Sequence, residues 1–395
     1  MSEIRGGNAI RRSDFIFLSL SRKFNDGNLF IEVIRKGRTI MNKIKVAVIG
    51  VGTISNHHIE SYLNNENVEL YAFCDINEKR LKLMGEKYGI TRLYTDEAHM
   101  LAELSELDAV SVCTWNSAHA PCTIMALNAG KHVLCEKPMA TCVEDAIAMK
   151  EAAEKNGKLL MIGFVRRFGR DCAIVSDLIK NNKLGEIYYA KVANIRRNGN
   201  PGGWFGEKAR SGGGPLIDLG VHSIDLVRYL MGMPNPVSVY GTTFKKLGAR
   251  NDVKTPKAYV AASATEHDIC DCEDLASALI RFDNGVVISV EMSFSLNTGD
   301  EVNNIQMFGT EAGVKIDNNV TLYGTTDGYL TDTSFKGNNN LNMKEIFGGE
   351  IDHFVDCING KTCCINTADD GIAMMKILTA IYKSAECGHE VEISM

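Results

Sequence analysis

The chain has 395 residues, of which 45% are hydrophobic and 23% charged, and its formal net charge at pH 7 is −6. This length is enough for two domains with sizeable cores, and the composition is that of an ordinary globular protein. The acidic balance, with no long basic run in the body of the chain, argues against nucleic acid or an anionic membrane as a partner. No apolar stretch approaches the roughly 20 residues that a membrane span needs.

The twelve cysteines are scattered between Cys74 and Cys387, and several stand inside apolar patterns. This usage is typical of reduced thiols that serve as small core residues, so we expect a cytoplasmic protein. Two local clusters, Cys270–Cys272 and Cys363–Cys364, lack the C-x2-C spacing of a zinc knuckle. We therefore expect no metal site.

Residues 1–40 differ from the rest of the chain. They hold eight Lys/Arg against four Asp/Glu, and their one apolar cluster, 15–20, is too short for a signal-peptide core. Met41 stands just before the first strand of the predicted domain. One hypothesis is an accessory extension, such as an upstream start codon adds. The other is an arm that packs on a neighbouring subunit.

The segment Lys45–Ser55 reads KVAVIGVGTIS. A short β-rich run is followed by Gly50 and Gly52 and then by a helix-compatible stretch, which is the order of a dinucleotide-binding turn. Gly50 allows the sharp reversal, Gly52 leaves room for a pyrophosphate, and the helix N-terminus attracts the anion. Ser55 replaces the usual third glycine. Taken alone, the pattern also fits any strand-to-helix turn.

The next predicted strand, 69–75, ends in Asp75, about 25 residues after Gly50 and close to the spacing of roughly 20 that a ribose-binding acid shows. A carboxylate there accepts hydrogen bonds from both ribose hydroxyls and repels a 2′-phosphate. The sequence therefore predicts NAD rather than NADP. Arg80, on a helix predicted to start at 77, is expected to face solvent.

From 44 to 162 the chain alternates between the two element types. Strands are predicted at 44–49, 69–75, 108–113, 131–135 and 158–162, and helices at 54–64, 77–88, 96–104, 117–129 and 141–156. This alternation predicts a parallel, doubly wound sheet with right-handed crossovers. Gly130 suits the end of a helix, and Thr141 with Glu144 suits a capping box at the start of the next.

After about residue 164 the predicted strands follow one another. They are expected at 186–196, 236–245, 274–282, 286–295, 303–309 and 313–317, with helices at 214–231, 343–359 and 367–386. Asp283–Gly285 is a hairpin signal. The pattern predicts a second α/β domain with a large, mostly antiparallel open sheet. We expect a loop over 323–342 that contributes to the substrate site, with a mobile part at 337–340.

Cys135-Glu136-Lys137-Pro138 ends the predicted strand 131–135. Ligands of open α/β sheets bind outside the carboxyl ends of the strands, so Lys137 is placed to meet a substrate beside a bound cofactor. Its ammonium can hydrogen-bond an oxygen and stabilise negative charge on it. The alternative is a surface lysine ahead of a helix.

Asp218 and His222 stand four residues apart in an otherwise apolar helix start, GPLIDLGVHSID. Residues at this spacing share one helix face, and burying an acid and an imidazole there is costly without purpose. A histidine beside a carboxylate can exchange protons near neutral pH. The alternatives are a core ion pair or two metal ligands. Asp225, three residues further on, either orients the ring or packs elsewhere.

With these motifs the sequence resembles the Gfo/Idh/MocA family of sugar and inositol oxidoreductases over about residues 43–390. The resemblance rests on AVIGVGTIS with Asp75, on 113–140 (CTWNSAHAPCTIMALNAGKHVLCEKPMA), on GFVRRF (163–168) and on SGGGPLIDLGVHSIDL (211–226). The E-K-P element together with D-x-x-x-H is specific, whereas either alone is not. The chain departs from the family at Trp115, where proline is usual, and at Ser55, where glycine or alanine is commoner.

The resemblance implies an NAD(P)-binding Rossmann domain at 41–163 and a substrate-binding domain at 164–395 whose sheet forms a homodimer or homotetramer. It implies catalytic roles for Lys137, Asp218 and His222, and substrate contacts from these residues together with Arg167 and Trp204. The cofactor residues that it implies, with those of the glycine turn, are Gly50, Gly52, Thr53, Ile54, Ser55, Asp75, Ile76, Thr114, Trp115, Asn116, His119, Glu136 and Lys137.

The function that these expectations favour is NAD-dependent oxidation of a secondary alcohol of a sugar, inositol or related polyol, with His222 as base oriented by Asp218. Within the same family, transient sugar oxidation that ends in glycoside hydrolysis is an alternative. A dihydrodiol- or biliverdin-type reductase, which needs an apolar pocket, is another. A non-catalytic NAD sensor is disfavoured because Lys137, Asp218 and His222 are all present.

Overall fold

The computed structural model describes residues 18–25, 28–35, 43–257, 259–335 and 342–394, so the loop expected at 337–340 lies outside the described residues. The chain divides into two compact units, Met1–Asn42 and Lys43–Met395. In the first unit, β1 (Leu18–Asn25) pairs antiparallel with β2 (Asn28–Arg35). The sequence analysis did not predict this hairpin.

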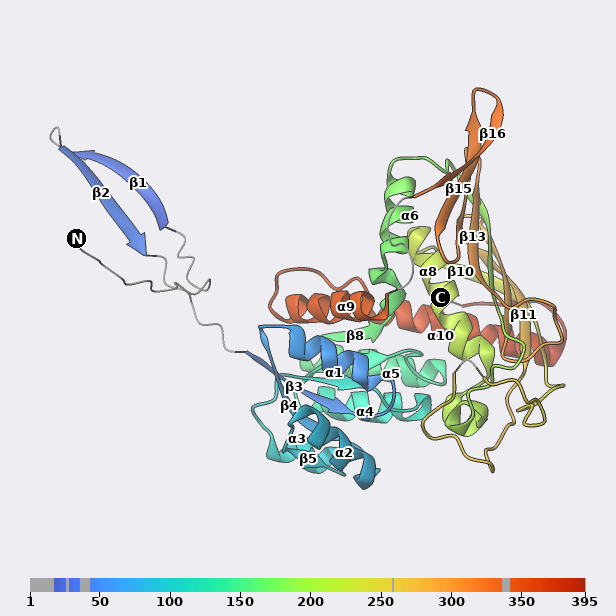
Figure 1. The fold of residues 1–395 in the computed structure, drawn as a ribbon, viewed down its shortest axis with the longest axis horizontal. Coiled ribbons are helices and arrows are strands. Elements are labelled where there is room, and N and C mark those ends of the chain that lie inside the picture. The colour runs from blue at the N-terminus through green and yellow to red at the C-terminus, as the bar shows by residue number, and fades with distance from the viewer. Residues whose placement is uncertain (1–17, 26–27, 36–42, 258, 336–341, 395) are drawn as a thin grey trace, which may run out of the picture. The chain divides into compact units, whose positions relative to one another are not determined.

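The second unit begins with a parallel six-stranded sheet. Its strands are β3 (Ile44–Ile49), β4 (Val68–Cys74), β5 (Leu93–Tyr94), β6 (Ala109–Val112), β7 (His132–Glu136) and β8 (Leu160–Gly163). They lie in the order β5-β4-β3-β6-β7-β8, so the chain runs to one edge and then returns past β3 to the other (Figure 1). The predicted doubly wound sheet is confirmed, and its switch point lies between β3 and β6, where open sheets bind ligands.

The connecting helices also follow the prediction. They are α1 (Ser55–Asn64), α2 (Glu78–Tyr88), α3 (Glu97–Glu103), α4 (Asn116–Asn128) and α5 (Val143–Asn156). Gly130 follows α4 with φ +74°, as its predicted role requires. The predicted cap of α5 is wrong. Cys142, not Thr141, has the extended backbone of an N-cap, and its Sγ accepts a hydrogen bond from the Asp145 N–H at 3.4 Å.

The second sheet has nine strands. They are β9 (Ile187–Ile195), β10 (Pro236–Phe244), β11 (Leu275–Phe282), β12 (Val287–Ser293), β13 (Val302–Gly309), β14 (Gly313–Ile316), β15 (Val320–Thr326), β16 (Tyr329–Ser334) and β17 (Val391–Glu392), in the order β16-β15-β14-β13-β9-β12-β11-β10-β17. Among these strands β9 and β12 run parallel and the other neighbours antiparallel, which confirms the mostly antiparallel sheet.

The expected loop at 323–342 is wrong for the part that the structure describes. Residues 320–334 form the hairpin β15–β16, which extends from the sheet in Figure 1. Its turn is Asp327-Gly328, with φ +51° and +84°. Such Asp-Gly turns match the twist of the strands that they join, so this dipeptide was a hairpin signal.

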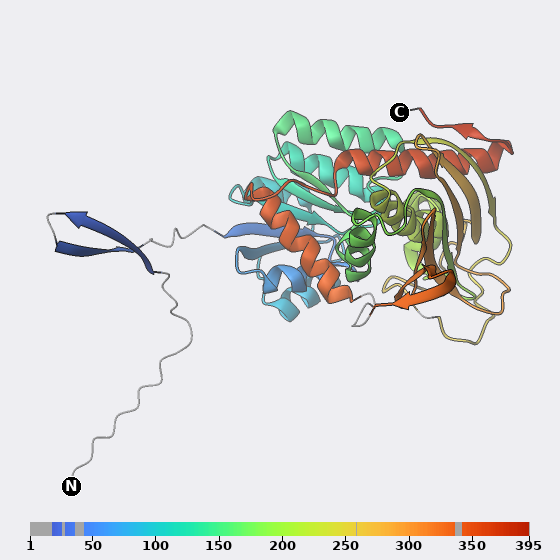
Figure 2. The same ribbon diagram turned by 90° about the horizontal axis from the view of Figure 1, so that it is seen from above.

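Helices cover one face of the nine-stranded sheet, where α8 (Val221–Leu230) and α10 (Ala368–Cys387) pack against it (Figure 2). The other segments in this half are η1 (Val165–Phe168), α6 (Arg170–Lys180), η2 (Gly203–Gly206), α7 (Lys208–Ser211), η3 (Leu216–Gly220) and α9 (Met343–Ile358). The sequence analysis missed α6. The helix predicted at 214–231 begins instead as the π-helical turn η3 before it continues as α8.

A single apolar core joins the two sheets of the second unit. Buried residues of β8, α10 and β11, among them Ile162, Met374 and Ile280, belong to one contiguous cluster. This packing fixes the carboxyl ends of the parallel strands opposite the start of α8. None of the described helices is long and apolar enough to cross a membrane.

Candidate active site

The turn between β3 and α1 has the geometry of a phosphate-binding turn. Gly50 adopts φ +85°, and an added Cβ would lie 2.8 Å from the backbone of Cys113 and Thr114. A Cβ at Gly52 would meet no protein atom within 4 Å, so the space beside it is open. Ser55 is fully buried, and its hydroxyl donates to the Gly52 carbonyl at 2.8 Å. Gly50 therefore serves the fold, and Gly52 leaves space for a ligand.

Asp75 lies at the end of β4 and is held by two backbone hydrogen bonds. Oδ2 accepts from the Val51 N–H at 2.8 Å and Oδ1 accepts from the Asn77 N–H at 2.7 Å. Each oxygen keeps a free lone pair for a ribose hydroxyl. Arg80, expected to face solvent, lines the same pocket, so a cation stands near this acid. The positive charge of Arg80 attracts a 2′-phosphate and so acts against the repulsion from Asp75.

A pocket of about 360 Å³ runs along this edge of the sheet. Of the residues expected to bind cofactor, it is lined by Gly50, Gly52, Thr53, Ile54, Asp75, Ile76, Thr114 and Trp115. The combination of an open glycine turn and a ribose-type carboxylate in one pocket fits a dinucleotide. Trp204, expected at the substrate, lines it as well.

Other expected cofactor residues support the pocket from behind. Asn116 donates from Nδ2 to the Ser211 carbonyl at 2.7 Å, and His119 Nδ1 lies 2.7 Å from the Pro138 carbonyl. Burial lowers the pKa of His119, so the ring is neutral and donates one hydrogen bond. Both side chains are buried and connect loops rather than line the pocket.

Lys137 and Asp218 form an ion pair. Lys137 follows β7, its peptide bond to Pro138 is cis, and its Nζ donates to Asp218 Oδ1 at 3.0 Å and to the Asp218 carbonyl at 3.1 Å. The two side chains are 15% and 17% exposed, so the pair is largely shielded but reachable by a small molecule. Lys137 is thereby fixed with donor capacity to spare.

His222 lies four residues after Asp218, on the first turn of α8. Burial lowers its pKa well below the usual value, and the positive charges of Lys137, Arg166 and Arg196 lower it further. Its Nδ1 is buried, with no hydrogen-bond partner in the described part of the chain. Within those residues no hydrogen bond joins His222 to Asp218, because the Asp218 carboxylate faces Lys137. The expectation that Asp218 orients His222 is corrected accordingly.

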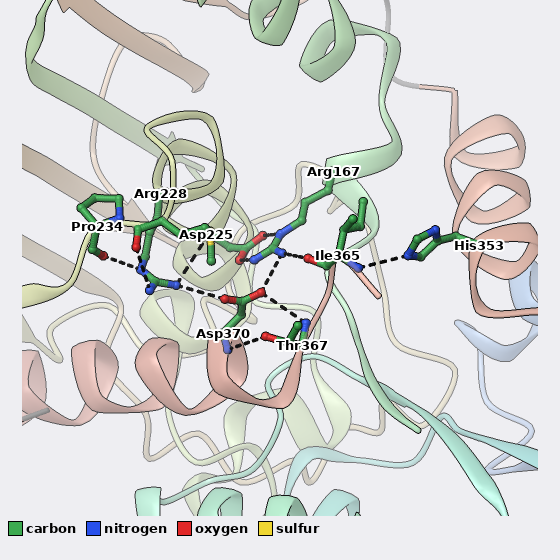
Figure 3. A network of polar contacts seen from close by, with 9 residues as sticks. Arg167, Asp225, Arg228, Pro234, His353, Ile365, Thr367 and Asp370 are labelled. Atoms are coloured by element: carbon green, nitrogen blue, oxygen red, sulfur yellow. Dashed lines mark hydrogen bonds and ion pairs between the residues drawn. The ribbon is translucent and has the colours of Figure 1, made fainter. Parts of the chain in front are cut away.

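Arg167 does not reach a substrate. Its side chain is 0% exposed and is held by Asp225, by Asp370 at 3.0 Å and by the Ile365 carbonyl (Figure 3). Both Asp225 oxygens accept from the guanidinium, at 3.0 and 2.5 Å. The resemblance implied a substrate contact, but this network occupies the side chain. Arg167 therefore fastens η1 to α8 and α10.

Glu136, also expected at the cofactor, lies in a buried cluster behind Lys137. Oε1 pairs with His58 Nε2 at 2.8 Å, and Oε2 accepts from the Lys137 N–H at 3.1 Å. The Glu350 carboxyl completes the group, and burial together with the Glu136 charge raises its pKa well above the usual value. His58, Glu136 and Glu350 are side chains of the types that bind metal ions, and so are those of a second group, His353, Cys357 and Cys364. His353 Nε2 already accepts from the Ile365 N–H at 3.1 Å.

The sequence analysis missed the far wall of the pocket. Phe205, Tyr259 and the segment 261–263 line it from two loops of the second half. Phe205 was detectable only as the neighbour of Trp204. Tyr259 carries no local signal, since it stands 54 residues further along the chain and meets Phe205 only through folding.

Comparisons with known proteins agree with this geometry. Residues 44–164 match the family model described as the oxidoreductase family, NAD-binding Rossmann fold, and residues 176–393 match its C-terminal alpha/beta domain. D-glucoside 3-dehydrogenase of Escherichia coli K12 is 34% identical over 91% of this chain and all of its own length.

Two further relatives extend the comparison. Myo-inositol 2-dehydrogenase of Thermotoga maritima is 28% identical over 70% of this chain and 75% of its own. The crystal structure of GenD2 from gentamicin A biosynthesis, solved with NAD, is 25% identical, has a TM-score of 0.73, and covers 92% of this chain and all of its own. The chain thus belongs to the Gfo/Idh/MocA family of oxidoreductases, with an NAD-binding Rossmann fold and a C-terminal α/β domain.

Proposed function

We propose that the protein is an NAD-dependent dehydrogenase that oxidises a secondary alcohol of a sugar, glycoside or inositol. The observation that carries this proposal is the Lys137–Asp218 ion pair beside a histidine whose pKa is lowered, at the carboxyl end of the sheet that holds the glycine turn. The named activities of the E. coli and Thermotoga relatives support the substrate class.

The mechanism divides between three side chains. His222, neutral because its pKa is low, accepts the hydroxyl proton as the alcohol is oxidised. Lys137 donates a hydrogen bond to the same oxygen and stabilises the negative charge that develops there. Asp218 holds Lys137 in place. When NAD is bound, it supplies the hydride acceptor that makes the alcohol a carbonyl.

The same proposal assigns 41–163 to cofactor binding and 164–395 to substrate binding and assembly. On the face of the nine-stranded sheet opposite α8 and α10, Tyr240 and Leu279 are paired across β10 and β11 and are 48% and 46% exposed. Exposed apolar side chains on a sheet face are typical of a subunit interface, so we assign a homodimer or homotetramer to it. The twelve free cysteines support a cytoplasmic location.

The test is formation of NADH from NAD, and then of NADPH from NADP, by the purified protein with free sugars, methyl glycosides, inositols and sugar acids. We expect NADH from one class and a higher kcat/KM with NAD. His222→Ala should lower kcat by about 100-fold or more and leave the Kd for NAD within about twofold. A Kd that collapses together with kcat contradicts the role of His222.

Release of an aglycone without net NADH is the result that favours the hydrolytic alternative. That reaction starts with the same oxidation, so His222 and Lys137 keep their roles. Retention of NAD through dialysis distinguishes it from a dehydrogenase that releases NADH at each turnover.

A further inference from the structure

The far wall of the cofactor pocket is aromatic. Trp204 and Phe205, on η2, are stacked with ring centroids 4.0 Å apart and planes 21° from parallel. Tyr259 packs edge-on against Phe205, with centroids 6.0 Å apart and planes at 85°. All three side chains line the pocket opposite the glycine turn. We call these three residues the aromatic platform.

Hydrogen bonds from a neighbouring loop hold the platform in place. The Gly203 N–H donates to Asp268, and the Lys208 N–H donates to Asp271 Oδ1 at 2.6 Å. These bonds tie the loop that carries Tyr259 to the turn that carries Trp204 and Phe205. A flat apolar surface that is ordered before a ligand arrives binds at lower entropic cost.

The platform is also fixed relative to the reacting groups. Trp204 and Phe205 lead directly into α7, and the Ser211 carbonyl at its end accepts from Asn116 at 2.7 Å. The chain then passes through the glycines 212–214 to η3, which carries Asp218. Trp204 and Phe205 therefore belong to the same short stretch of chain, 204–218, as Asp218. Arg196, eight residues before Trp204, is near enough to His222 for its charge to act on the ring.

The platform continues outward to solvent. Tyr259 lines the pocket and is 37% exposed, and its neighbour Val260 is 57% exposed, so apolar surface continues from the pocket to solvent. A monosaccharide can stack its C–H face on one aromatic ring, and three neighbouring rings offer more apolar surface than one sugar ring covers. An exposed apolar patch at the mouth of a binding pocket is typical of a site for a ligand group.

We propose that the substrate is a glycoside whose aromatic or other flat apolar aglycone lies on Trp204, Phe205 and Tyr259 while its sugar meets Lys137, Asp218 and His222. This inference rests on the proposed function and adds the aglycone class to it. Ring stacking and burial of the aglycone supply the affinity, and the sugar hydroxyl supplies the chemistry. The rival occupant of the platform is a ring of the cofactor itself.

The experiment compares phenyl and methyl D-glucosides of both anomers as substrates, at saturating NAD. We expect kcat/KM for the preferred phenyl glucoside to exceed that of the methyl glucoside about tenfold, a free-energy difference of about 1.4 kcal/mol. Tyr259→Ala and Phe205→Leu should each bring this ratio toward one. Phe205→Leu keeps an apolar side chain in the fold, and circular dichroism checks that both variants are folded.

The matched control is Tyr329→Ala, which removes a tyrosine that is 76% exposed on β16, and it should leave the ratio unchanged. A wild-type ratio near one overturns the inference. So does a ratio that both platform variants preserve while the Kd for NAD rises, because the rings then serve the cofactor.

Failure of the proposed function gives a different result. If no glucoside yields NADH, calorimetric titration of the protein saturated with NADH still compares the two aglycones. A phenyl preference of about tenfold there, lost in Tyr259→Ala, supports the platform without the dehydrogenase reaction. Equal affinities of the two glucosides overturn it.

Discussion

At the scale of single residues, the site depends on how its charges are distributed around His222. Lys137 is compensated by Asp218 at 3.0 Å, and Arg166 is compensated by Asp171 at 2.8 Å. Burial lowers the pKa of His222 well below 6.5, and the positive charges of Lys137, Arg166 and Arg196 lower it further. A neutral imidazole is the form that accepts a proton, so activity should persist at mildly acidic pH.

The pH profile of kcat/KM tests this balance. Protonation of His222 removes the base, so the acidic limb of the profile should lie below pH 6.5. Arg196→Met removes one of the charges that lower the pKa of His222, and the acidic limb should move to higher pH. The neighbouring Arg197→Met is the control and should leave the limb in place. An Arg196→Met profile identical to wild type would mean that the charge of Arg196 does not act on the base.

At the scale of elements, the two glycines of the β3–α1 turn have different roles. Gly50 is needed for stability, and Gly52 is needed for cofactor binding. A methyl group at Gly50 collides with backbone 2.8 Å away and must adopt φ +85°, whereas one at Gly52 meets no protein atom within 4 Å. Gly50→Ala should therefore lower the free energy of unfolding by about 2 kcal/mol or more. Gly52→Ala should change it by less than about 0.5 kcal/mol but raise the Kd for NAD about tenfold.

Urea unfolding and calorimetric titration with NAD measure the two effects on the same preparations. The two glycines serve as controls for each other. Equal loss of stability in both variants would mean that the space beside Gly52 is filled by protein and not by cofactor.

The Arg167 network makes a second prediction at this scale. Arg167→Met leaves Asp225, 2% exposed, without its counter-charge, and should lower the free energy of unfolding by about 3–5 kcal/mol. Lys361→Met, which breaks an exposed pair with Asp356, should cost less than about 1 kcal/mol. Urea unfolding compares them. Unchanged stability with a raised KM would restore the substrate role that the resemblance implied for Arg167.

Some features of these elements could be predicted from the sequence, and others depend on the folded structure. Five of the six strands of the first sheet, and its helices, were predictable because apolar periodicity and turn residues are local signals. The missed strand, β5, has only two residues and so no period to detect. Thr141 and Cys142 compete for one cap, and only the backbone conformation decides between them. Arg167 follows Arg166 directly in the chain, yet Arg167 is held by α8 and α10 through Asp225 and Asp370, whereas Arg166 pairs with Asp171 on α6. This difference depends on how the helices pack.

At the scale of the whole molecule, the uncovered face of the nine-stranded sheet predicts assembly. Leu279→Glu places a charge in the proposed interface and should shift the molar mass measured by light scattering to that of a monomer. Leu83→Glu is the matched control, because Leu83 is 63% exposed on α2, and it should leave the mass unchanged. A wild-type protein that is monomeric at micromolar concentration contradicts the proposed interface.

The chain contains two tryptophans, Trp115 and Trp204, and both line the cofactor pocket from opposite halves of the second unit. The intrinsic fluorescence of the protein is therefore a local optical probe of that pocket. Tryptophan emission overlaps the absorption of reduced nicotinamide, so binding of NADH should quench it by energy transfer. Binding and release of the reduced cofactor can thus be timed by stopped flow with no label attached.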